Sequence, residues 1–194
     1  MSQFPVVIVL AAGRGERFAA SGGTVHKLDA LLAGKRVIDH VLDAVRASGL
    51  AHHVVRPDAH ESAGAGMGDS IAAGVRATPD ASSWLILPAD LPLVSSDTLR
   101  TIAFAPPCGV TVPRYQGEQG HPVRFDAVCG PDLMKLKGSS GAAPVLRAQA
   151  AINSIAFVDL DDVGVVTDID TLEALQRAET LLRERGNPRT KTAA

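Results

Sequence analysis

A run of aliphatic residues, VVIVL at positions 6–10, ends directly in a small-residue turn that contains Gly13 and Gly15. An uninterrupted apolar run of this length is typical of a strand that is covered on both faces, as strands in parallel sheets are. The segment therefore predicts a central parallel strand that delivers a glycine turn to one edge of a sheet.

The rest of the chain alternates between helical and extended patterns. Apolar residues at helical spacing predict five helices: 36–48 with Gly49 as its stop, 69–76 with Asp69 as its cap, one that begins at Ser95 or Ser96, 142–150, and 171–185. Apolar runs predict further strands at 53–56, 84–87 and 154–158, and two extended segments, 110–113 and 123–125, flank a flexible polar connection at 116–120. Such alternation predicts a three-layer α/β/α fold with a mostly parallel, Rossmann-like sheet.

Length and composition restrict the class of protein. The 194 residues show no linker or repeat, so we expect one domain over 1–186 and a flexible tail over 187–194. With 19 basic and 21 acidic residues the net charge is −2, which argues against a nucleic-acid-binding surface. The first apolar run is too short to span a bilayer and lacks a basic start, so no membrane partner and a cytoplasmic location are predicted.

The two cysteines do not form a metal framework. Cys108 and Cys129 lie 21 residues apart without a CxxC pair, and the preferred interpretation is a pair of idle thiols in a reducing compartment. A single disulfide between them stays open at this point.

The turn after the first strand is a candidate phosphate site. Its residues run from Leu10 to Phe18, LAAGRGERF, with Lys27 downstream. Small residues let the backbone N–H groups approach phosphate oxygens, and Arg14, Arg17 and Lys27 supply positive charge. The turn is neither a dinucleotide fingerprint, because Phe18 stands where the third glycine belongs, nor a Walker loop, because no GK[ST] follows. A purely structural turn is the alternative.

Asp90 is the candidate metal ligand. It follows the WLIL strand within Pro88–Pro92, and ligands collect at the carboxyl ends of strands in open α/β sheets. A carboxylate there is well placed to hold a Mg²⁺ ion that bridges phosphates. The alternative is that Asp90 only accepts backbone N–H bonds in a proline turn.

A second acidic string lies near the C-terminal helix, TDIDTLE at 167–173. Asp170 and Glu173 predict a capping box for that helix, which leaves Asp168 as a second metal carboxylate. Asp159, Asp161 and Asp162 are expected to form a solvated edge.

Two further segments are weaker candidates. The glycines in Gly64–Ser70 can hold a flat ligand against the backbone or form a flexible surface loop. His121 is a candidate substrate contact, whereas the remaining histidines (His26, His40, His52, His53 and His60) are expected to be surface or core residues. No Ser-His-Asp or Cys-His set is present, so we expect catalysis by positioning and metal rather than through a covalent intermediate.

Taken together, these strings resemble the MobA-like nucleotidyltransferases, and look closest to molybdenum cofactor cytidylyltransferases. The match runs in order through LAAGRGERF, GKRVIDHVL, GMGDSIAAGV, PADLPLV, GHPVRF, GSSGA and DIDTLEAL. The resemblance implies the fold of nucleotide-diphospho-sugar transferases. It also implies transfer of CMP from CTP to molybdopterin with release of pyrophosphate, and a molybdoenzyme or its chaperone as a potential partner.

The resemblance also assigns site residues. It places the nucleotide on Leu10, Ala11, Ala12, Gly13, Arg14, Gly15, Arg17, Lys27, Gly66, Met67 and Ser70, and Mg²⁺ on Asp90 with an acidic residue of DIDT, Asp168 or Asp170. Arg14, Lys27 and Asp90 are expected to be catalytic, and His121, Ser139 and Ser140 to contact the acceptor. The guanylyl members usually have LAGG where this chain has LAAG, so CTP is favoured over GTP.

Two departures keep alternatives open. Ser21-Gly22-Gly23 lengthens the gap before Lys27, and Gly138–Ala143 replaces the GDxGAR string that family members often show. The acceptor is then open to another phosphorylated metabolite, such as methylerythritol phosphate or a sugar phosphate. A non-catalytic module that binds and delivers the cofactor is the alternative of a different class, and a purely structural α/β domain is the least favoured interpretation.

Overall fold

The computed structural model describes residues 4–56 and 66–186. The predicted tail at 187–194, His60, and Gly64 and Ala65 of the glycine run lie outside these residues. The strands are β1 (Val6–Leu10), β2 (Leu31–Leu32), β3 (Lys35–Arg36), β4 (Ala51–Val55), β5 (Ser83–Pro88), β6 (Val110–Tyr115), β7 (Glu118–Gln119), β8 (Val123–Asp126) and β9 (Ile155–Asp159). The α-helices are α1 (Glu16–Ala20), α2 (Val37–Ser48), α3 (Met67–Ala77), α4 (Ser96–Ala103), α5 (Gly130–Leu133), α6 (Ala143–Ala151) and α7 (Leu172–Gly186), and single 3₁₀ turns lie at Ala127–Cys129, Gly138–Ser140 and Val163–Val166.

The central feature is a seven-stranded sheet in the order β4-β1-β5-β8-β6-β7, with β9 paired to β6. β1 pairs in parallel with both β4 and β5, and β6 pairs in parallel with β9. β8 runs antiparallel to both β5 and β6, and β7 forms a hairpin with β6. Five strands of the sheet therefore point the same way, and the predicted mostly parallel α/β fold is confirmed.

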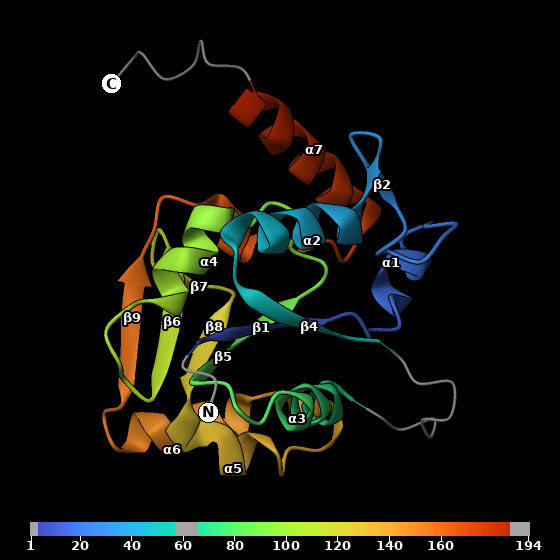
Figure 1. The fold of residues 1–194 in the computed structure, drawn as a ribbon. Helices are drawn as coiled ribbons and strands as arrows, with labels where there is room; N and C mark the ends of the chain where they lie inside the picture. Colours follow the sequence, from blue (N-terminus) through green and yellow to red (C-terminus); the bar gives the residue numbers. More distant parts are fainter. Residues whose placement is uncertain (1–3, 57–65, 187–194) are drawn as a thin grey trace.

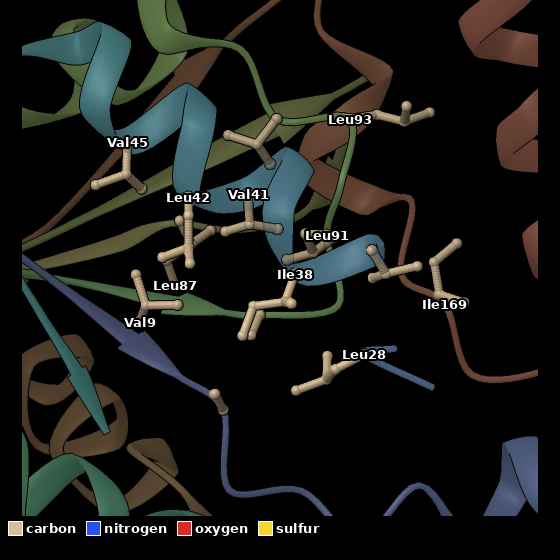
Figure 2. Packing of buried hydrophobic residues seen from close by; sticks show 14 of the residues in the cluster. Val9, Leu28, Ile38, Val41, Leu42, Val45, Leu87, Leu91, Leu93 and Ile169 are labelled. Atoms are coloured by element: carbon tan, nitrogen blue, oxygen red, sulfur yellow. The ribbon is translucent and has the colours of Figure 1, made fainter. Parts of the chain in front are cut away.

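Helices cover both faces of this sheet. Figure 1 shows α2 and α4 on one face, with α7 beside α2, and α3, α5 and α6 on the other. β1 is buried throughout, because Val7 and Val9 face the first layer and Val6, Ile8 and Leu10 face the second. In Figure 2, the apolar face of α2 packs onto β1 and β5, and Ile169 joins the same cluster from the chain before α7.

Several elements follow the sequence patterns closely. β1 covers the predicted residues, and α2 ends at Gly49, whose φ of 73° suits a residue without a Cβ. Ser95 caps α4, since its hydroxyl accepts a hydrogen bond from the Thr98 N–H. The predicted helix 69–76 is three residues too short: α3 begins two residues earlier, at Met67, and ends one residue later, at Ala77, and Asp69 caps it from within its first turn.

The polar connection at 116–120 is not a flexible link between two segments. Gln116 and Gly117 both have positive φ, and this turn pairs β7 with the end of β6. Short elements such as α1 and the β2–β3 hairpin carry too few residues for a periodic pattern and were not predicted.

Asp162 is buried, which corrects the prediction that it belongs to a solvated edge. Its carboxylate accepts hydrogen bonds from the Thr98 hydroxyl at 2.6 Å, the Ser95 N–H at 3.0 Å and the Gly164 N–H at 2.9 Å, and it pairs with Arg185 at 2.6 Å. Burial acts to raise the pKa of Asp162, but these donors outweigh it and hold the pKa below its usual range. The carboxylate therefore ties α4 to α7.

Replacing Asp162 with Asn should lower the free energy of unfolding by about 2–4 kcal/mol at pH 7, because Asn keeps the shape and removes the charge that the donors favour. A lowered pKa in the folded state stabilises the protein above the ordinary carboxyl pKa, and this contribution is lost as the pH falls through the folded value. Urea unfolding at several pH values should therefore show the difference between wild type and variant shrinking below about pH 4. Asp161→Asn, at the exposed neighbouring position, is the matched control and should change stability little; a pH-independent loss for Asp162→Asn would contradict this account.

The two cysteines are free. Burial raises the pKa of the Cys129 thiol to about 11, so this side chain is un-ionised at neutral pH, as expected of an idle thiol. Within the described residues no helix combines the length and apolarity needed to cross a bilayer.

Candidate active site

A cleft of about 880 Å³ opens beside the carboxyl ends of β1 and β5. Most of the predicted site residues line it: Leu10, Ala12, Gly13, Arg14, Gly15, Arg17, Lys27, Gly66, Met67, Ser70, Asp90, His121, Ser139, Asp168 and Asp170. Two predicted residues do not. Ala11 is buried and its N–H bonds to the Val55 carbonyl, which continues the parallel ladder, and Ser140 is exposed outside the cleft lining.

Lys27 bridges two carboxylates in this cleft. Its Nζ lies 2.5 Å from Asp90 Oδ2 and 2.7 Å from Asp170 Oδ1, and the lysine is 9% exposed. Arg17 pairs with the other oxygen of Asp170 at 2.6 Å. Burial acts to lower the pKa of the Lys27 ammonium, but its ion pairs with Asp90 and Asp170 outweigh burial and raise the pKa, so Lys27 is a fixed positive charge.

Asp90 keeps one oxygen for another partner. Its Oδ2 contacts Lys27, whereas its Oδ1 is buried and has no hydrogen-bond partner. The backbone holds the residue in place: the Ala89 N–H bonds to the Leu10 carbonyl, and the Ile169 N–H bonds to the Asp90 carbonyl. An unsatisfied buried carboxylate oxygen is a costly feature, and a cation or a ligand donor would satisfy it. The alternative that Asp90 only accepts backbone N–H bonds finds no support, because its carboxylate accepts a hydrogen bond from the Lys27 ammonium.

The acidic string before α7 behaves differently from the prediction. Thr171 caps the helix, since its hydroxyl accepts the Ala174 N–H at 3.1 Å, and the carboxylate of Asp170 faces Lys27 and Arg17 instead. Partial burial and a hydrogen bond to Asp170 raise the pKa of Asp168, while Asp170, despite burial that acts to raise its pKa, is held low by Lys27. The two neighbouring carboxyl groups therefore differ, with the negative charge favoured on Asp170, which the two cations face, and disfavoured on Asp168. Ser21 of the inserted segment supports this end, because its hydroxyl accepts the Leu172 N–H.

The glycine turn is shaped by local geometry. Gly15 has a φ of 66°, which turns the chain into α1, and a Cβ built at Gly13 would meet nothing within 4 Å. His26, which was expected to be an ordinary surface or core residue, braces this turn. Its Nδ1 accepts the Leu28 N–H, which leaves Nε2 to donate to the Gly13 carbonyl at 2.8 Å. Arg14 is exposed beside Glu16, with 3.6 Å between their charged groups.

His121 and Ser139 also line the cleft. Burial lowers the pKa of His121, which keeps the imidazole neutral at pH 7. The structure adds residues that the sequence did not single out: Glu118 and Gln119 of the β7 hairpin, and Val165 and Val166 of the turn before Asp168. A small apolar cavity of about 70 Å³ adjoins the cleft and shares Leu10, Met67, Pro88 and His121 with it.

Comparison with known proteins decides the family. The family model "MobA-like NTP transferase domain" matches residues 7–155, a span that contains the glycine turn, Lys27, Asp90 and His121. The chain belongs to the MobA-like NTP transferase family. It is therefore a nucleotidyltransferase, and the matched span ends before Asp168 and Asp170, whose part in the site rests on the structure alone.

Individual relatives agree with this MobA-like assignment. Purine catabolism protein PucB of Bacillus subtilis is 28% identical over 89% of this chain and 94% of its own length. Bifunctional protein GlmU of Xanthomonas campestris is 31% identical, but over only 52% of this chain and 25% of its own.

Solved structures share the architecture. A nucleotidyl transferase from Methanothermobacter thermautotroptrophicus, Mth528, superimposes with a TM-score of 0.78 at 25% identity, covering 95% of this chain and 99% of that one. Molybdopterin-guanine dinucleotide biosynthesis protein A from Archaeoglobus fulgidus has a TM-score of 0.62 at 17% identity, with 92% and 99% covered. Mycobacterium tuberculosis Rv0371c, solved in complex with manganese, has a TM-score of 0.64 at 21% identity, with the same coverage. At these identities, the last two show a likeness of fold alone.

Proposed function

We propose that the protein transfers CMP from CTP to molybdopterin with release of pyrophosphate, and that Mg²⁺ assists the transfer. The observation that carries the proposal is the Lys27–Asp90–Asp170 cluster beside the glycine turn of a MobA-like chain. The choice of CTP rests on LAAG at positions 10–13, and the choice of molybdopterin on the resemblance to molybdenum cofactor cytidylyltransferases.

The residues present fit a divalent cation. Asp90 Oδ1 is buried and lacks a partner, and the carboxylates of Asp168 and Asp170 line the same cleft. Among the residues the structure describes, however, no three acidic, histidine or cysteine side chains converge closely enough to hold a metal by themselves. We infer that Asp90, with Asp168 or Asp170, would hold Mg²⁺ together with phosphate oxygens of the nucleotide. The ion would supply neutralisation of phosphate charge at the transferring group.

The chain's own residues account for the other requirements of the reaction. An oxygen of the acceptor phosphate forms a bond to the α-phosphorus of CTP, and the bond from that phosphorus to the pyrophosphate oxygen breaks. Lys27 and Arg17, released from Asp170, would balance the negative charge that gathers on pyrophosphate. An anionic acceptor phosphate carries no proton that must be removed, so the site needs positioning more than a general base.

The departure at Gly138–Ala143 motivates two other candidates. Both keep the nucleotide site: transfer to a different phosphorylated metabolite, and delivery of a bound cofactor to a molybdoenzyme or its chaperone without turnover. They differ from the main proposal in what happens after nucleotide has bound.

One assay separates these candidates. Pyrophosphate release is measured with each of the four NTPs and Mg²⁺, with and without molybdopterin. We expect release only with molybdopterin and at least about tenfold faster with CTP than with GTP. Release with a sugar phosphate or methylerythritol phosphate instead would identify another acceptor. Tight CTP binding without release would favour a delivery module, and no binding of any NTP would contradict the proposal as a whole.

A further inference from the structure

The carboxylate of Asp69 joins two neighbouring segments that both contribute residues to the cleft lining. Its Oδ2 accepts hydrogen bonds from the Gly66 N–H at 2.9 Å and from the Gly138 N–H at 2.8 Å. Gly66 begins the segment that leads into α3, and Gly138 begins the 3₁₀ turn Gly138–Ser140. The family resemblance assigns residues of segment 66–70 to the nucleotide and residues of segment 138–140 to the acceptor, and both segments contribute to the cleft wall.

These two segments are packed backbone against backbone. A Cβ built at Gly66 would lie 2.3 Å from the backbone C and O atoms of Gly138, and one at Gly68 would lie 2.9 Å from the Lys137 carbonyl oxygen. No side chain fits between them, so the glycines serve this close approach. The prediction that the glycines of this run hold a flat ligand therefore needs refinement, because Gly66 and Gly68 face the other segment.

The charge of Asp69 suits this link. Its hydrogen bonds from Gly66 and Gly138 hold the pKa of the carboxyl below its usual range, so it is ionised at neutral pH. Bonds from N–H groups to an ionised carboxylate are stronger than bonds to a neutral acceptor. Lys137 adds a favourable charge from the same segment.

We propose that Asp69 is a positioning residue that couples segment 66–70 to segment 138–140, so that nucleotide bound on segment 66–70 orders segment 138–140 for the acceptor. The inference rests on the proposed function in one respect only, namely that nucleotide occupies the side of the cleft formed by the glycine turn and segment 66–70. Closely packed backbones with one shared acceptor move together, so ordering one segment orders the other.

Backbone amide hydrogen exchange tests this without any acceptor. Exchange at residues 11–17 and 137–141 is measured for the full chain with and without CTP and Mg²⁺. In the wild type, nucleotide should slow exchange in both regions, by about tenfold at 137–141. In Asp69→Ala the slowing should remain at 11–17 and disappear at 137–141. Asp69→Asn keeps an oxygen that can accept both N–H bonds, and it should restore the slowing at 137–141 in large part.

Two further variants keep the test decisive. Gly68→Ala leaves Asp69 intact but adds a methyl group against the Lys137 carbonyl, so it should also reduce the slowing at 137–141, and it decides the question if Asp69→Ala does not fold. Asp132→Asn, at an exposed surface pair with Lys135, is the control and should behave as the wild type.

Undiminished slowing at 137–141 in folded Asp69→Ala, or in Gly68→Ala, would overturn the coupling. Absence of slowing at 11–17 in the wild type would instead count against the proposed nucleotide site, so the two failures are distinguishable.

Discussion

Replacing Asp90 with Asn should lower kcat for CTP-dependent pyrophosphate release about a thousandfold. Asn keeps the size of the side chain but loses the charge that Lys27 contacts at 2.5 Å, and its amide offers a poor ligand at the position of the unpartnered Oδ1. The loss should appear mainly in kcat rather than in the KM for CTP, because the glycine turn and the arginines remain. The measurement is steady-state pyrophosphate release over a range of CTP and Mg²⁺ concentrations.

The variant must be compared with a change of the same kind elsewhere. Asp97→Asn removes an exposed carboxylate that pairs with Arg100 on α4, and it should leave the rate within about twofold of the wild type. If Asp90→Asn folds with an unchanged melting temperature and keeps its rate, the cluster does not act on the transferring group and the proposed mechanism is wrong.

Replacing Arg124 with Met should destabilise the protein by about 3–5 kcal/mol, which is roughly 10 °C in melting temperature for a chain of this size. Arg124 is 3% exposed. Its guanidinium donates hydrogen bonds to two carbonyls in the last turn of α4 and to two just after it, which are those of Ile102, Ala103, Ala105 and Pro106. Its Nε also lies 3.0 Å from Asp126 as an ion pair outside hydrogen-bond geometry. Met fills the space but leaves the buried carbonyls of Ile102 and Ala103 without these donors.

Thermal and urea unfolding measure this effect. Arg114→Met is the matched control, because Arg114 stacks on the Phe157 ring and pairs with Asp159 at a partly exposed position on β6. That pair should contribute no more than about 1 kcal/mol. If the two variants lose the same amount of unfolding free energy, the buried hydrogen bonds of Arg124 do not stabilise the protein more than an exposed ion pair does.

The sequence predicted the elements that local patterns determine. β1 and the capped helices α2 and α4 depend on residues within a few positions of one another, so apolar spacing and cap chemistry locate them. The roles of Asp162 and Arg124 depend on partners far along the chain, such as Ser95 and Ile102. Neither partner can be found from spacing, and for this reason Asp162 was assigned to a solvated edge.

The candidate site divides in the same way. The glycine turn and Asp90 follow strands directly, so their position at one edge of the sheet was predictable. The prediction for Asp170 was wrong in part. The local sequence pattern indicated a capping box, but Thr171 caps the helix, and the Asp170 carboxylate contacts Lys27, a residue far away in the sequence. The sequence predicted Asp69 only as a helix cap and gave no role to His26 or Glu118, and only the packing of distant segments shows where these residues act.

The Lys27 cluster has a consequence for protein synthesis. Asp170 follows β9, which is the last strand among the described residues, whereas Lys27 lies before α2. During synthesis, every strand of the sheet is therefore made before Asp170, the second carboxylate partner of Lys27. A chain that stops after β9 would still contain all strands of the sheet, but it would lack Asp170. The order of residues thus means that the cluster of Lys27, Asp90 and Asp170 can form only after all strands of the sheet have been synthesised.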